Sequence, residues 1–555
     1  MEVLSFKKAN CKDCYKCIRE CPIKAIRVND RQAQIIPEEC ILCGRCVKIC
    51  PQNAKQVRDD VPRVKEMMKA GKKVVASLAP SYIAAFDTDG FAPIAEAIKK
   101  LGFLDVQETA AGANVVKREY ERLVREKQPV IISSCCHSVI RLIQKYHIGC
   151  LPYVAKVLSP MDAHGHLMKE QYPDAEVVFI SPCISKKDEV DQYCKGESIS
   201  ITITFDELAD WFAEEGVQID NSKGDGSRYR SRFFPETGGI IKSMDLDPTY
   251  KYIAIDGVEN CRRALDEIAE GKMEGYFIEM SACEGSCVNG PCIREHTERR
   301  LKGALRVDTF AGDQRFDVAA PDTISYNYPF LGGKKVKFGS EAINDMLYKM
   351  GKTSPEKELN CGSCGYPTCR DKAIAILEGK AKIEMCLPFL KEKAESFSDS
   401  IINNTPNAII VMDEDLVVQQ INRAAVRMFK LKDANDILHE HIVRILNPGD
   451  YQNIITSALH TTTRMHYLAD YQLYVDETIL YDRQYHIVIS LMRDVTEQET
   501  LRGQDAELRR QTVEITDKVI EKQMRVVQEI ASLLGETTAE TKIALTKLKD
   551  AMAHE

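Results

Sequence analysis

The sequence predicts a multidomain α/β protein, and three features along the chain lead to that expectation. One cysteine motif occurs twice within the first 60 residues. From about residue 70, short Val/Ile-rich runs alternate with amphipathic stretches, which is typical of parallel strands connected by helices. After residue 395 cysteine is absent and the strand pattern becomes an alternating one. At 555 residues the chain has room for three or four domains, each with its own core.

Composition narrows the class of protein. The net charge is −8 with 28% charged residues, so no basic surface argues for nucleic acid. No apolar run approaches the roughly 20 residues that span a bilayer. The N-terminal stretch carries no apolar core of an export signal. Twenty-one cysteines in such a chain are expected to be metal ligands rather than disulfides, so we expect a cytoplasmic protein.

The repeated motif lies in residues 1–60. CKDCYKCIRECP and CILCGRCVKICP share the spacing C-x2-C-x2-C-x3-C-P, in which three close thiolates hold three corners of a 4Fe–4S cubane. The fourth cysteine of each run then binds the other cluster. The predicted ligand sets are Cys11, Cys14, Cys17 and Cys50 for one cluster, and Cys21, Cys40, Cys43 and Cys46 for the second. A pair of zinc sites is the alternative. The stretch resembles a bacterial two-cluster ferredoxin, which implies an α+β fold.

Four apolar runs in the middle of the chain each end at residues suited to a site. They are KKVVASLAPS (72–81), PVIISSCC (129–136), AEVVFISPC (175–183) and GYFIEMSAC (275–283). Parallel sheets bind ligands beyond the carboxyl ends of their strands. Three of the four runs deliver cysteine there. One such cysteine alone would more often be a buried structural thiol, but three converging strands favour a metal site.

The three cysteine-bearing segments resemble, in order, the signature segments of FeFe hydrogenases. They read ISSCCHS, SPCISKKDE and EMSACEGSC, and together with residues 1–60 the resemblance covers roughly residues 1–390. It implies a two-lobed domain with parallel sheets over 61–350 and the reaction H2 = 2 H+ + 2 e−. It also implies an H-cluster, in which a 4Fe–4S cubane joins a two-iron subcluster carrying CO, CN− and a dithiolate. The implied cubane ligands are Cys136, Cys183, Cys283 and the bridging Cys287.

The resemblance also assigns roles around the cluster. Cys135 matches the proton-delivering thiol, and Lys186 matches a lysine that donates hydrogen bonds to a cyanide, a role that suits a compact ammonium. Glu119 and Glu189 are the expected carboxylates of the proton route. The position aligned to the serine of that route is Ala155, which predicts an interrupted relay.

The departures from the family pattern fall in the pocket itself. His137 and Val139 replace a proline and a tryptophan. Ser181 and Ser281 stand where methionines normally pack against the two-iron unit. Exchanging apolar thioethers for hydroxyls changes the polarity and hydrogen bonding around a cofactor. Four cysteines remain without a ligand role: Cys150, Cys194 and Cys261, expected to be structural thiols, and Cys292, which follows the last ligand closely.

A fourth cysteine set follows in residues 351–392. CGSCGYPTC (361–369) with Cys386 gives C-x2-C-x4-C-x16-C. The glycines let backbone N–H groups turn toward the sulfurs, and a helical stretch returns the last ligand. This resembles a small 4Fe–4S module of electron-transfer chains, with a zinc ribbon as the alternative. The predicted ligands are Cys361, Cys364, Cys369 and Cys386, which makes three accessory 4Fe–4S clusters in total.

Residues 393–497 resemble a PAS sensory domain. A helix and two strands surround the Asp413–Asp415 turn, and alternating strands end at Asp494-Val495-Thr496. His486 is expected to be a strand residue rather than a haem ligand.

The tail, 498–555, places one apolar stripe on a helix: Leu508, Ile515, Val519, Val526, Ile530 and Leu533. This spacing predicts a coiled-coil homodimer, and a helix packed on its own chain is the alternative. Because the tail shows neither a kinase ATP-binding motif nor a helix–turn–helix, we expect signal output through a partner protein.

Together these features predict a sensory FeFe hydrogenase of low activity that relays redox state through its clusters to the PAS domain. One alternative is a metabolic, ferredoxin-dependent hydrogenase with a regulatory PAS domain. A second is an electron-transfer scaffold without H2 chemistry. The expected partners are H2 and protons, a redox protein such as ferredoxin, a downstream signalling protein and the maturation proteins that assemble the two-iron unit.

Overall fold

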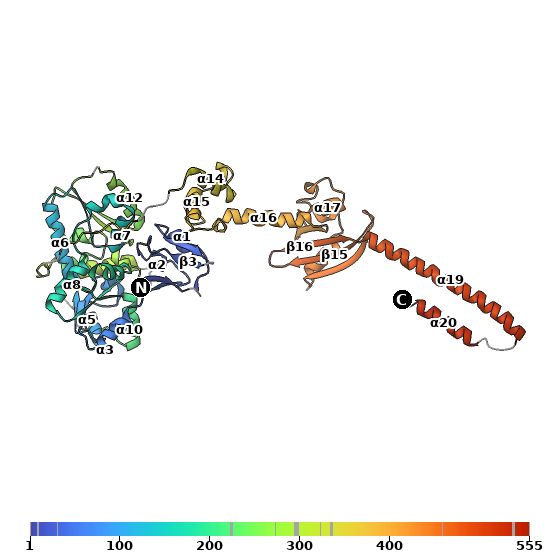
Figure 1. Ribbon diagram of the computed structural model, residues 1–555, viewed down its shortest axis with the longest axis horizontal. Helices are drawn as coiled ribbons and strands as arrows, with labels where there is room; N and C mark the ends of the chain where they lie inside the picture. Colours follow the sequence, from blue (N-terminus) through green and yellow to red (C-terminus); the bar gives the residue numbers. More distant parts are fainter. Residues whose placement is uncertain are drawn as a thin grey trace. The chain divides into compact units, whose positions relative to one another are not determined.

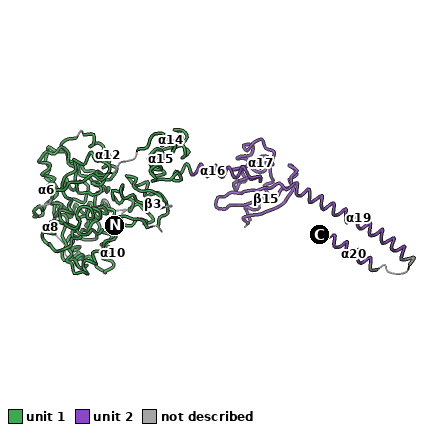
Figure 2. Tube along the Cα trace, in the orientation of Figure 1, with its two compact units in different colours: residues 1–389 green, residues 390–555 purple. Residues whose placement is uncertain are grey.

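The computed structural model divides the chain into two compact units, residues 1–389 and 390–555 (Figures 1 and 2). It describes residues 2–553 apart from 8–9, 30–31, 223–225, 272, 294–298, 322–323, 333–336, 458 and 535–538. The predicted mixed α/β, multidomain architecture is confirmed. No helix of the described chain is long and apolar enough to cross a membrane.

The ferredoxin-like segment is a small fold of two antiparallel strand pairs and two short helices. Strands β1 (Leu4–Phe6) and β4 (Lys55–Val57) pair antiparallel, as do β2 (Ile26–Asn29) and β3 (Gln32–Ile35). Each cysteine repeat contributes one short helix, α1 (Lys16–Glu20) and α2 (Arg45–Lys48). Left-handed residues, Tyr15 and Gly44, precede these helices and turn the cysteine loops into them.

Two parallel sheets form the central region, as the Val/Ile-rich runs predict. The first sheet has the order β6-β5-β8-β9, and the second has the order β10-β11-β7. The strands are β5 (Val74–Leu78), β6 (Asp105–Glu108), β7 (Val130–Ile132), β8 (Glu176–Ser181), β9 (Ile201–Thr204), β10 (Lys251–Asp256) and β11 (Tyr276–Ser281). The middle strands β5, β8 and β11 are buried almost throughout because helices cover both faces.

Helices connect these strands and carry the site. Those of the first lobe include α3 (Val61–Lys69), α5 (Phe91–Lys100), α8 (Pro160–Gln171), α9 (Ser185–Glu189) and α10 (Phe205–Glu215). Helix α6 (Ala110–Arg125) packs on the second sheet, where Tyr120 contacts Phe277 of β11. Those of the second lobe include α7 (His137–Tyr146), α11 (Gly239–Ser243) and α12 (Val258–Ala269), while α4 (Tyr82–Ala85) packs on α13 (Arg299–Phe310). The apolar cores of the two lobes are separate clusters, which leaves room for a site between them.

The small module contains two helices, α14 (Ser340–Lys349) and α15 (Cys369–Leu377). Ile343, Leu347 and Met350 of the first helix region pack against Ala373 of the second. The boundary expected at residue 351 therefore falls after a helix that belongs to the module core. The sequence did not indicate this because α14 carries no cysteine.

The second unit begins in α16 (Leu387–Asn404) and contains one five-stranded antiparallel sheet of order β13-β12-β16-β15-β14. Its strands are β12 (Ala408–Asp413), β13 (Val418–Ile421), β14 (Thr461–Leu468), β15 (Leu473–Asp482) and β16 (Ile487–Asp494), with helices α17 (Arg423–Met428) and α18 (Gly449–Thr456). The predicted pair of strands around Asp413–Asp415 is confirmed. His486 lies in the turn before β16, in contact with Glu414, rather than within a strand.

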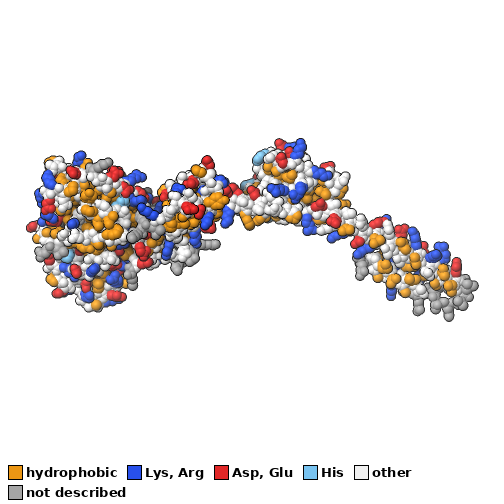
Figure 3. Space-filling view, turned by 45° about the horizontal axis from the view of Figure 1, so that its top comes forward, with side chains coloured by type: hydrophobic (Ala, Val, Ile, Leu, Met, Phe, Trp, Pro, Cys, Tyr) orange, Lys and Arg blue, Asp and Glu red, His pale blue; other side chains and the backbone are white. Residues whose placement is uncertain are grey.

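The tail forms a long helix, α19 (Thr496–Leu534), and α20 (Ala539–Ala553) folds back along it. Lys549 pairs with Asp517 at 3.1 Å between the two helices. Leu508, Ile515 and Val519 are still more than half exposed, and Figure 3 shows apolar side chains on the surface of this helical pair. The side chain of Leu533, the last member of the predicted stripe, lies outside the described residues.

Candidate functional site

A cavity of about 120 Å³ lies at the carboxyl ends of four parallel strands. The segments that follow β5, β7, β8 and β11 all reach it, as the strand pattern predicts. Four of the five cysteines of the signature segments line it: Cys135, Cys136, Cys183 and Cys287. The fifth, Cys283, lies close enough to Cys183, Cys136 and Cys287 for their thiols to add to the rise that burial causes in its pKa. The structure thus brings all five cysteines to one place.

Cys135 and Cys136 are neighbours in sequence but face different surroundings. Cys136 is the residue before α7, and its thiol lies near Cys183. The Cys135 thiol instead lies 3.2 Å from the hydroxyl of Tyr120, which is itself 2.9 Å from the Ser134 hydroxyl. Burial raises the pKa of Cys135 to about 12, although Tyr120 and Lys186 act against that rise. Cys135 is therefore a protonated, hydrogen-bonded thiol at the cavity wall.

Lys186 places a buried cation at the same cavity. Its Nζ donates to Glu189 Oε2 at 2.6 Å, one turn along α9. Burial opposes the charged form of Lys186, but the Glu189 carboxylate outweighs it and leaves the pKa of Lys186 raised. An ammonium has three donors, so Lys186 keeps two for a ligand while it holds Glu189.

The predicted carboxylates have different placements. Glu189 accepts from Lys186 and from the Ser159 hydroxyl, and it lies 3.6 Å from His137 Nδ1. Glu119 instead pairs with Arg122 at 2.8 Å on α6 and is not among the residues that line the cavity. The structure therefore gives no support to a relay role for Glu119.

The structure also bears on the proton route that we expect to be interrupted at Ala155. Ala155 is buried, but Ser159, four residues later, supplies the hydroxyl that meets Glu189. Ser159 is the N-cap residue of α8, and its hydroxyl also accepts from the Asp162 N–H. A serine is thus present beside Glu189, at a different position from the one predicted.

Ser181 and Ser281 both line the cavity, at the ends of β8 and β11. Each hydroxyl bonds to the backbone of the cysteine that follows it. The Cys183 N–H donates to Ser181 Oγ at 3.3 Å, and Ser281 Oγ donates to the Cys283 carbonyl at 3.4 Å. The serines therefore support the cysteine loops as well as contributing polar surface.

Glu279 is a cavity residue that sequence reasoning missed. It is 4% exposed on β11 and accepts backbone N–H bonds from Gly238 at 3.0 Å and Ile241 at 3.2 Å. Burial raises the pKa of Glu279 to about 7 despite these bonds, and nearby Glu236 adds to the rise. The available signal was a single carboxylate inside the apolar run GYFIEMSAC. A carboxyl group that titrates near neutrality beside a thiol is suited to proton transfer.

The remaining predicted ligands surround three further hollows. One is lined by Cys11, Cys14, Cys17 and Cys50, the second by Cys21, Cys40, Cys43 and Cys46, and the third by Cys361, Cys364, Cys369 and Cys386. The exchange of the fourth cysteine between the two repeats is thus present in the fold. Within the described residues, no three His, Cys, Asp or Glu side chains are close enough for a single metal ion. Four thiols spread around a hollow suit a four-iron cluster.

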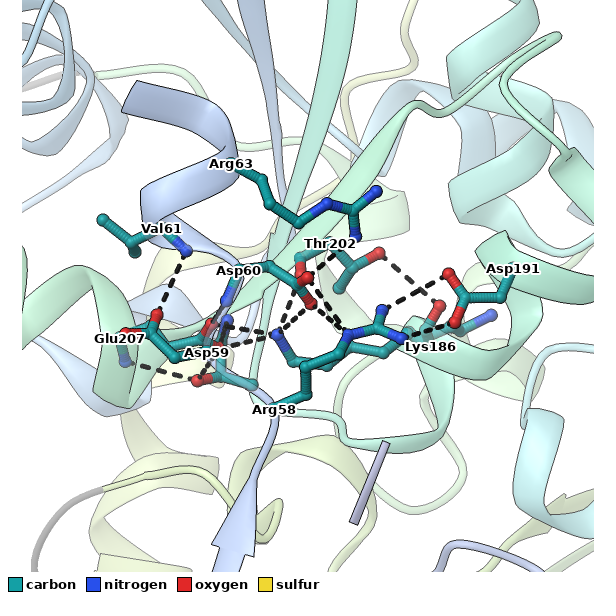
Figure 4. A network of polar contacts seen from close by, with 11 residues as sticks. Arg58, Asp59, Asp60, Val61, Arg63, Lys186, Asp191, Thr202 and Glu207 are labelled. Atoms are coloured by element: carbon teal, nitrogen blue, oxygen red, sulfur yellow. Dashed lines mark hydrogen bonds and ion pairs between the residues drawn. The ribbon is translucent and has the colours of Figure 1, made fainter. Parts of the chain in front are cut away.

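A buried ion-pair network fixes α9 through Lys187, the neighbour of the cavity residue Lys186 (Figure 4). Lys187, next to Lys186, is fully buried and donates to Asp60 and Glu207, each at 2.9 Å, and to the Thr202 carbonyl. Asp60 also forms ion pairs with Arg58 and Arg63, each at 2.9 Å. Burial opposes the charge on Asp60, but Lys187 and the arginines outweigh it and lower the pKa of Asp60. The chain that leaves the ferredoxin-like segment is thereby fastened to the helix that carries Lys186.

Comparison with protein families gives four matches along the chain. Residues 72–291 match the iron only hydrogenase large subunit, C-terminal domain, and residues 4–51 match a 4Fe-4S dicluster domain. Residues 358–388 match a short Fe-S cluster family, and residues 396–495 match the PAS fold.

Three curated relatives show the range of the similarity. A periplasmic Fe hydrogenase large subunit of Nitratidesulfovibrio vulgaris is 27% identical over 52% of this chain and 86% of its own length. Iron hydrogenase 1 of Clostridium pasteurianum is 24% identical over 42% of this chain, which spans about half (52%) of that relative. The nuclear prelamin A recognition factor of Xenopus laevis is 22% identical over 42% of this chain and 67% of its own length.

Solved structures give matches of two kinds. A structure from work on oxygen inactivation of an FeFe hydrogenase is 16% identical, covers 50% of this chain and 100% of its own, and has a TM-score of 0.41. A Chlamydomonas reinhardtii FeFe hydrogenase is 16% identical over 47% of this chain and 95% of its own, with a TM-score of 0.37. A PAS domain from Haloarcula marismortui is 18% identical over 19% of this chain and 98% of its own, with a TM-score of 0.16.

Proposed function

We propose that this chain, whose residues 72–291 form an iron-only hydrogenase large-subunit domain, is a hydrogen sensor that converts H2 slowly and reports through its PAS domain. The observation that carries the proposal is the cavity in which four cysteine thiols and a buried ammonium meet, on one chain with three further cysteine sets and a PAS fold. The cavity would supply the H2 chemistry, the three further cysteine sets would carry electrons, and the PAS fold would receive the signal.

The donor set fits an H-cluster. Cys136, Cys183, Cys283 and Cys287 would hold the cubane, with Cys287 as the bridge to the two-iron unit. When bound, the cluster supplies the open site at which H2 is exchanged for protons and electrons. Lys186 would direct its two remaining N–H donors at an anionic ligand of that unit.

Proton handling falls to the residues of the cavity wall. Cys135 can pass its proton to Glu279, which lies near enough to affect the pKa of the thiol. Beyond Glu279 lies Glu236, whose partner Lys242 is half-exposed. This order gives a path from the cavity to the surface. Lys186, Glu189 and Ser159 form a second polar chain, whose tight ion pair argues for a structural and electrostatic role.

Slow turnover is supported by the pocket surface. Ser181 and Ser281 offer hydroxyls that are already bonded to the cysteine loops. Such groups hold the cofactor in a more polar environment than thioethers do, which shifts its potential and ligand affinities. A sensor gains from slow conversion because it does not consume its own signal.

Two other functions remain as alternatives. A metabolic hydrogenase would exchange electrons with ferredoxin and use the PAS domain only for regulation. A scaffold that only transfers electrons would use the four cysteine sets without H2 chemistry. Cytoplasmic location, maturation by dedicated assembly proteins, a homodimer through the tail and a downstream signalling partner belong to the proposal.

Two measurements on matured protein test the proposal. Infrared spectroscopy should show CO and CN− bands, and Cys287→Ala should abolish them. Addition of H2 should then change hydrogen–deuterium exchange within residues 396–553, while turnover stays well below that of a metabolic hydrogenase. Bands without any change in exchange, together with fast turnover, would favour the metabolic alternative. Absent bands after successful maturation of a control hydrogenase would favour the scaffold.

A further inference from the structure

The small module docks on the ferredoxin-like segment at three places. Gly365 lies against Arg19, and a Cβ at Gly365 would come within 3.1 Å of the Arg19 backbone nitrogen. The Val28 N–H donates to the Lys380 carbonyl at 3.3 Å. The Lys380 ammonium in turn pairs with Glu39 at 2.8 Å. Backbone, side-chain and ionic contacts therefore fix one face of the module.

Tyr366 occupies the centre of this interface. It is 4% exposed, lines the hollow of the module cysteines and packs in one apolar cluster with Cys17, Cys21 and Cys364. Burial raises the pKa of Tyr366, and the thiols of Cys364 and Cys21 add to that rise, so both lie close to the phenol. Its hydroxyl has no hydrogen-bond partner among the described residues. A buried hydroxyl without a partner beside cysteines fits the sulfur of a bound cluster as its acceptor.

Two lysines flank the Tyr366 ring. Lys24 Nζ lies 5.9 Å from the ring centroid and donates to the carbonyls of Ile18 and Arg19. Lys372 Nζ lies 5.5 Å from the same centroid, is buried, and donates to the Lys382 carbonyl at 2.6 Å. Positive charge between two ligand sets stabilises an added electron on either side.

The Cys21 set also faces the hydrogenase cavity. Cys43 of this set lies near enough to Cys283 to affect its pKa. Arg45 pairs with Glu259 at 2.7 Å, and Lys48 donates to the Asn289 carbonyl at 2.9 Å. The Cys11 set, in contrast, surrounds a hollow lined only by residues 11–55, and its Cys14 is exposed.

We infer that the Cys21 set is a branch point, from which an electron passes to the module across Tyr366 without visiting the Cys11 set. With clusters bound by Cys21, Cys40, Cys43 and Cys46 and by the module cysteines, the first would lose one electron and the second would gain it, with no bond broken and no proton moved. Oxidation of H2 supplies the electrons, and that source alone rests on the proposed function. The Cys11 set, of which Cys14 is exposed, is left as the port for an external carrier.

The test uses the full chain reconstituted with 4Fe–4S clusters, without the two-iron unit, and reduced by dithionite. Electron paramagnetic resonance should show the module signal split by magnetic coupling to a neighbouring reduced cluster. The module signal is identified by its loss in Cys361→Ser/Cys364→Ser. The coupling should survive in Cys11→Ser/Cys14→Ser, which removes the other ferredoxin cluster.

Two variants probe the interface itself. Gly365→Ala should remove the splitting, whereas Gly379→Ala should keep it, because both glycines have positive φ but only Gly365 faces Arg19. Lys380→Ala removes the ion pair with Glu39 without replacing a predicted ligand, so it should weaken the splitting with iron content unchanged. If Gly365→Ala loses iron, the Lys380→Ala result decides whether the interface carries the coupling.

An uncoupled module signal in wild type would overturn the inference, and so would coupling that disappears with the Cys11 cluster. This experiment uses no H2. Either result therefore says nothing against hydrogen sensing, which is tested separately by infrared spectroscopy and hydrogen–deuterium exchange.

Discussion

At the scale of single residues, the cavity separates side chains of similar chemistry by their surroundings. Cys136 lies among other thiols, whereas Cys135 lies against a tyrosine hydroxyl and near Glu279. Glu189 is held by a lysine, whereas Glu279 accepts only neutral backbone donors. Glu189 therefore belongs to an ion pair, whereas burial raises the pKa of Glu279, and the two acids have different roles.

Cys135→Ala is expected to separate proton delivery from cluster binding. The variant should keep the CO and CN− bands and lose about 10²-fold or more in turnover, because a proton donor is missing rather than a ligand. Infrared spectra and H2 evolution measured on one preparation provide the check. Cys150→Ala, which removes a buried thiol that does not line the cavity, is the matched control and should keep both. Wild-type turnover in Cys135→Ala would exclude the relay role.

Glu279→Gln is expected to change the pH dependence of stability. The folded pKa, about 7, lies above the ordinary value of 4.5, so burial favours the neutral acid. The corresponding stability is complete below pH 4.5 and is lost as the pH rises through 7, on the order of 3 kcal/mol. Between pH 5 and pH 8 the melting temperature of the glutamine variant should therefore rise relative to that of wild type. For Glu284→Gln, a change at an exposed residue, the melting temperature should instead follow the same pH dependence as wild type.

At the scale of secondary-structure elements, α9 is held from two sides. Lys186 points into the cavity, while Lys187 anchors the same helix to Asp60 and Glu207. A five-residue helix has little stability of its own, so its position depends on these contacts. The linker from the ferredoxin-like segment thus takes part in placing a cavity residue.

Lys187→Met is expected to be strongly destabilising, by about 3–5 kcal/mol, because it removes the buried cation from Glu207 and leaves Asp60 with the two arginines alone. Lys72→Met removes an exposed pair with Glu176 and should have little effect. Thermal unfolding measures the difference. In matured protein the CN− bands should also shift in Lys187→Met, since α9 positions Lys186. A stable variant with unshifted bands would contradict the anchoring role.

At the scale of the whole molecule, four cysteine sets predict the iron content. Four sites with four irons each give about 16 iron atoms per chain before maturation. Cys361→Ser/Cys364→Ser should lower that value by about 4, and removal of the structural thiol Cys261 should not change it. Iron analysis together with cluster absorbance is the measurement. A reconstituted wild type with fewer than about 12 iron atoms would mean that one set does not bind a cluster.

The three accessory cysteine sets were predictable from sequence because their spacing is local, whereas the cavity set was predicted through its resemblance to a family. A loop such as CKDCYKC can wrap a cluster whatever surrounds it, and the repeat of that spacing also implies the exchange of Cys21 and Cys50. The parallel strands were predictable for a similar reason, since burial on both faces requires a continuous apolar run. The PAS strands followed from their alternation and from the turn at Asp413–Asp415.

Only the tertiary structure decided which side chains meet across the cavity. Glu279 and Cys135 are 144 positions apart in the sequence, and Ser159 precedes α8 in a third segment, so no spacing rule could join them. The docking of Gly365, Tyr366 and Lys380 on the ferredoxin-like segment likewise depends on two surfaces folded independently. Sequence determines ligands because their chemistry is local, whereas relays and interfaces depend on the distances that packing sets.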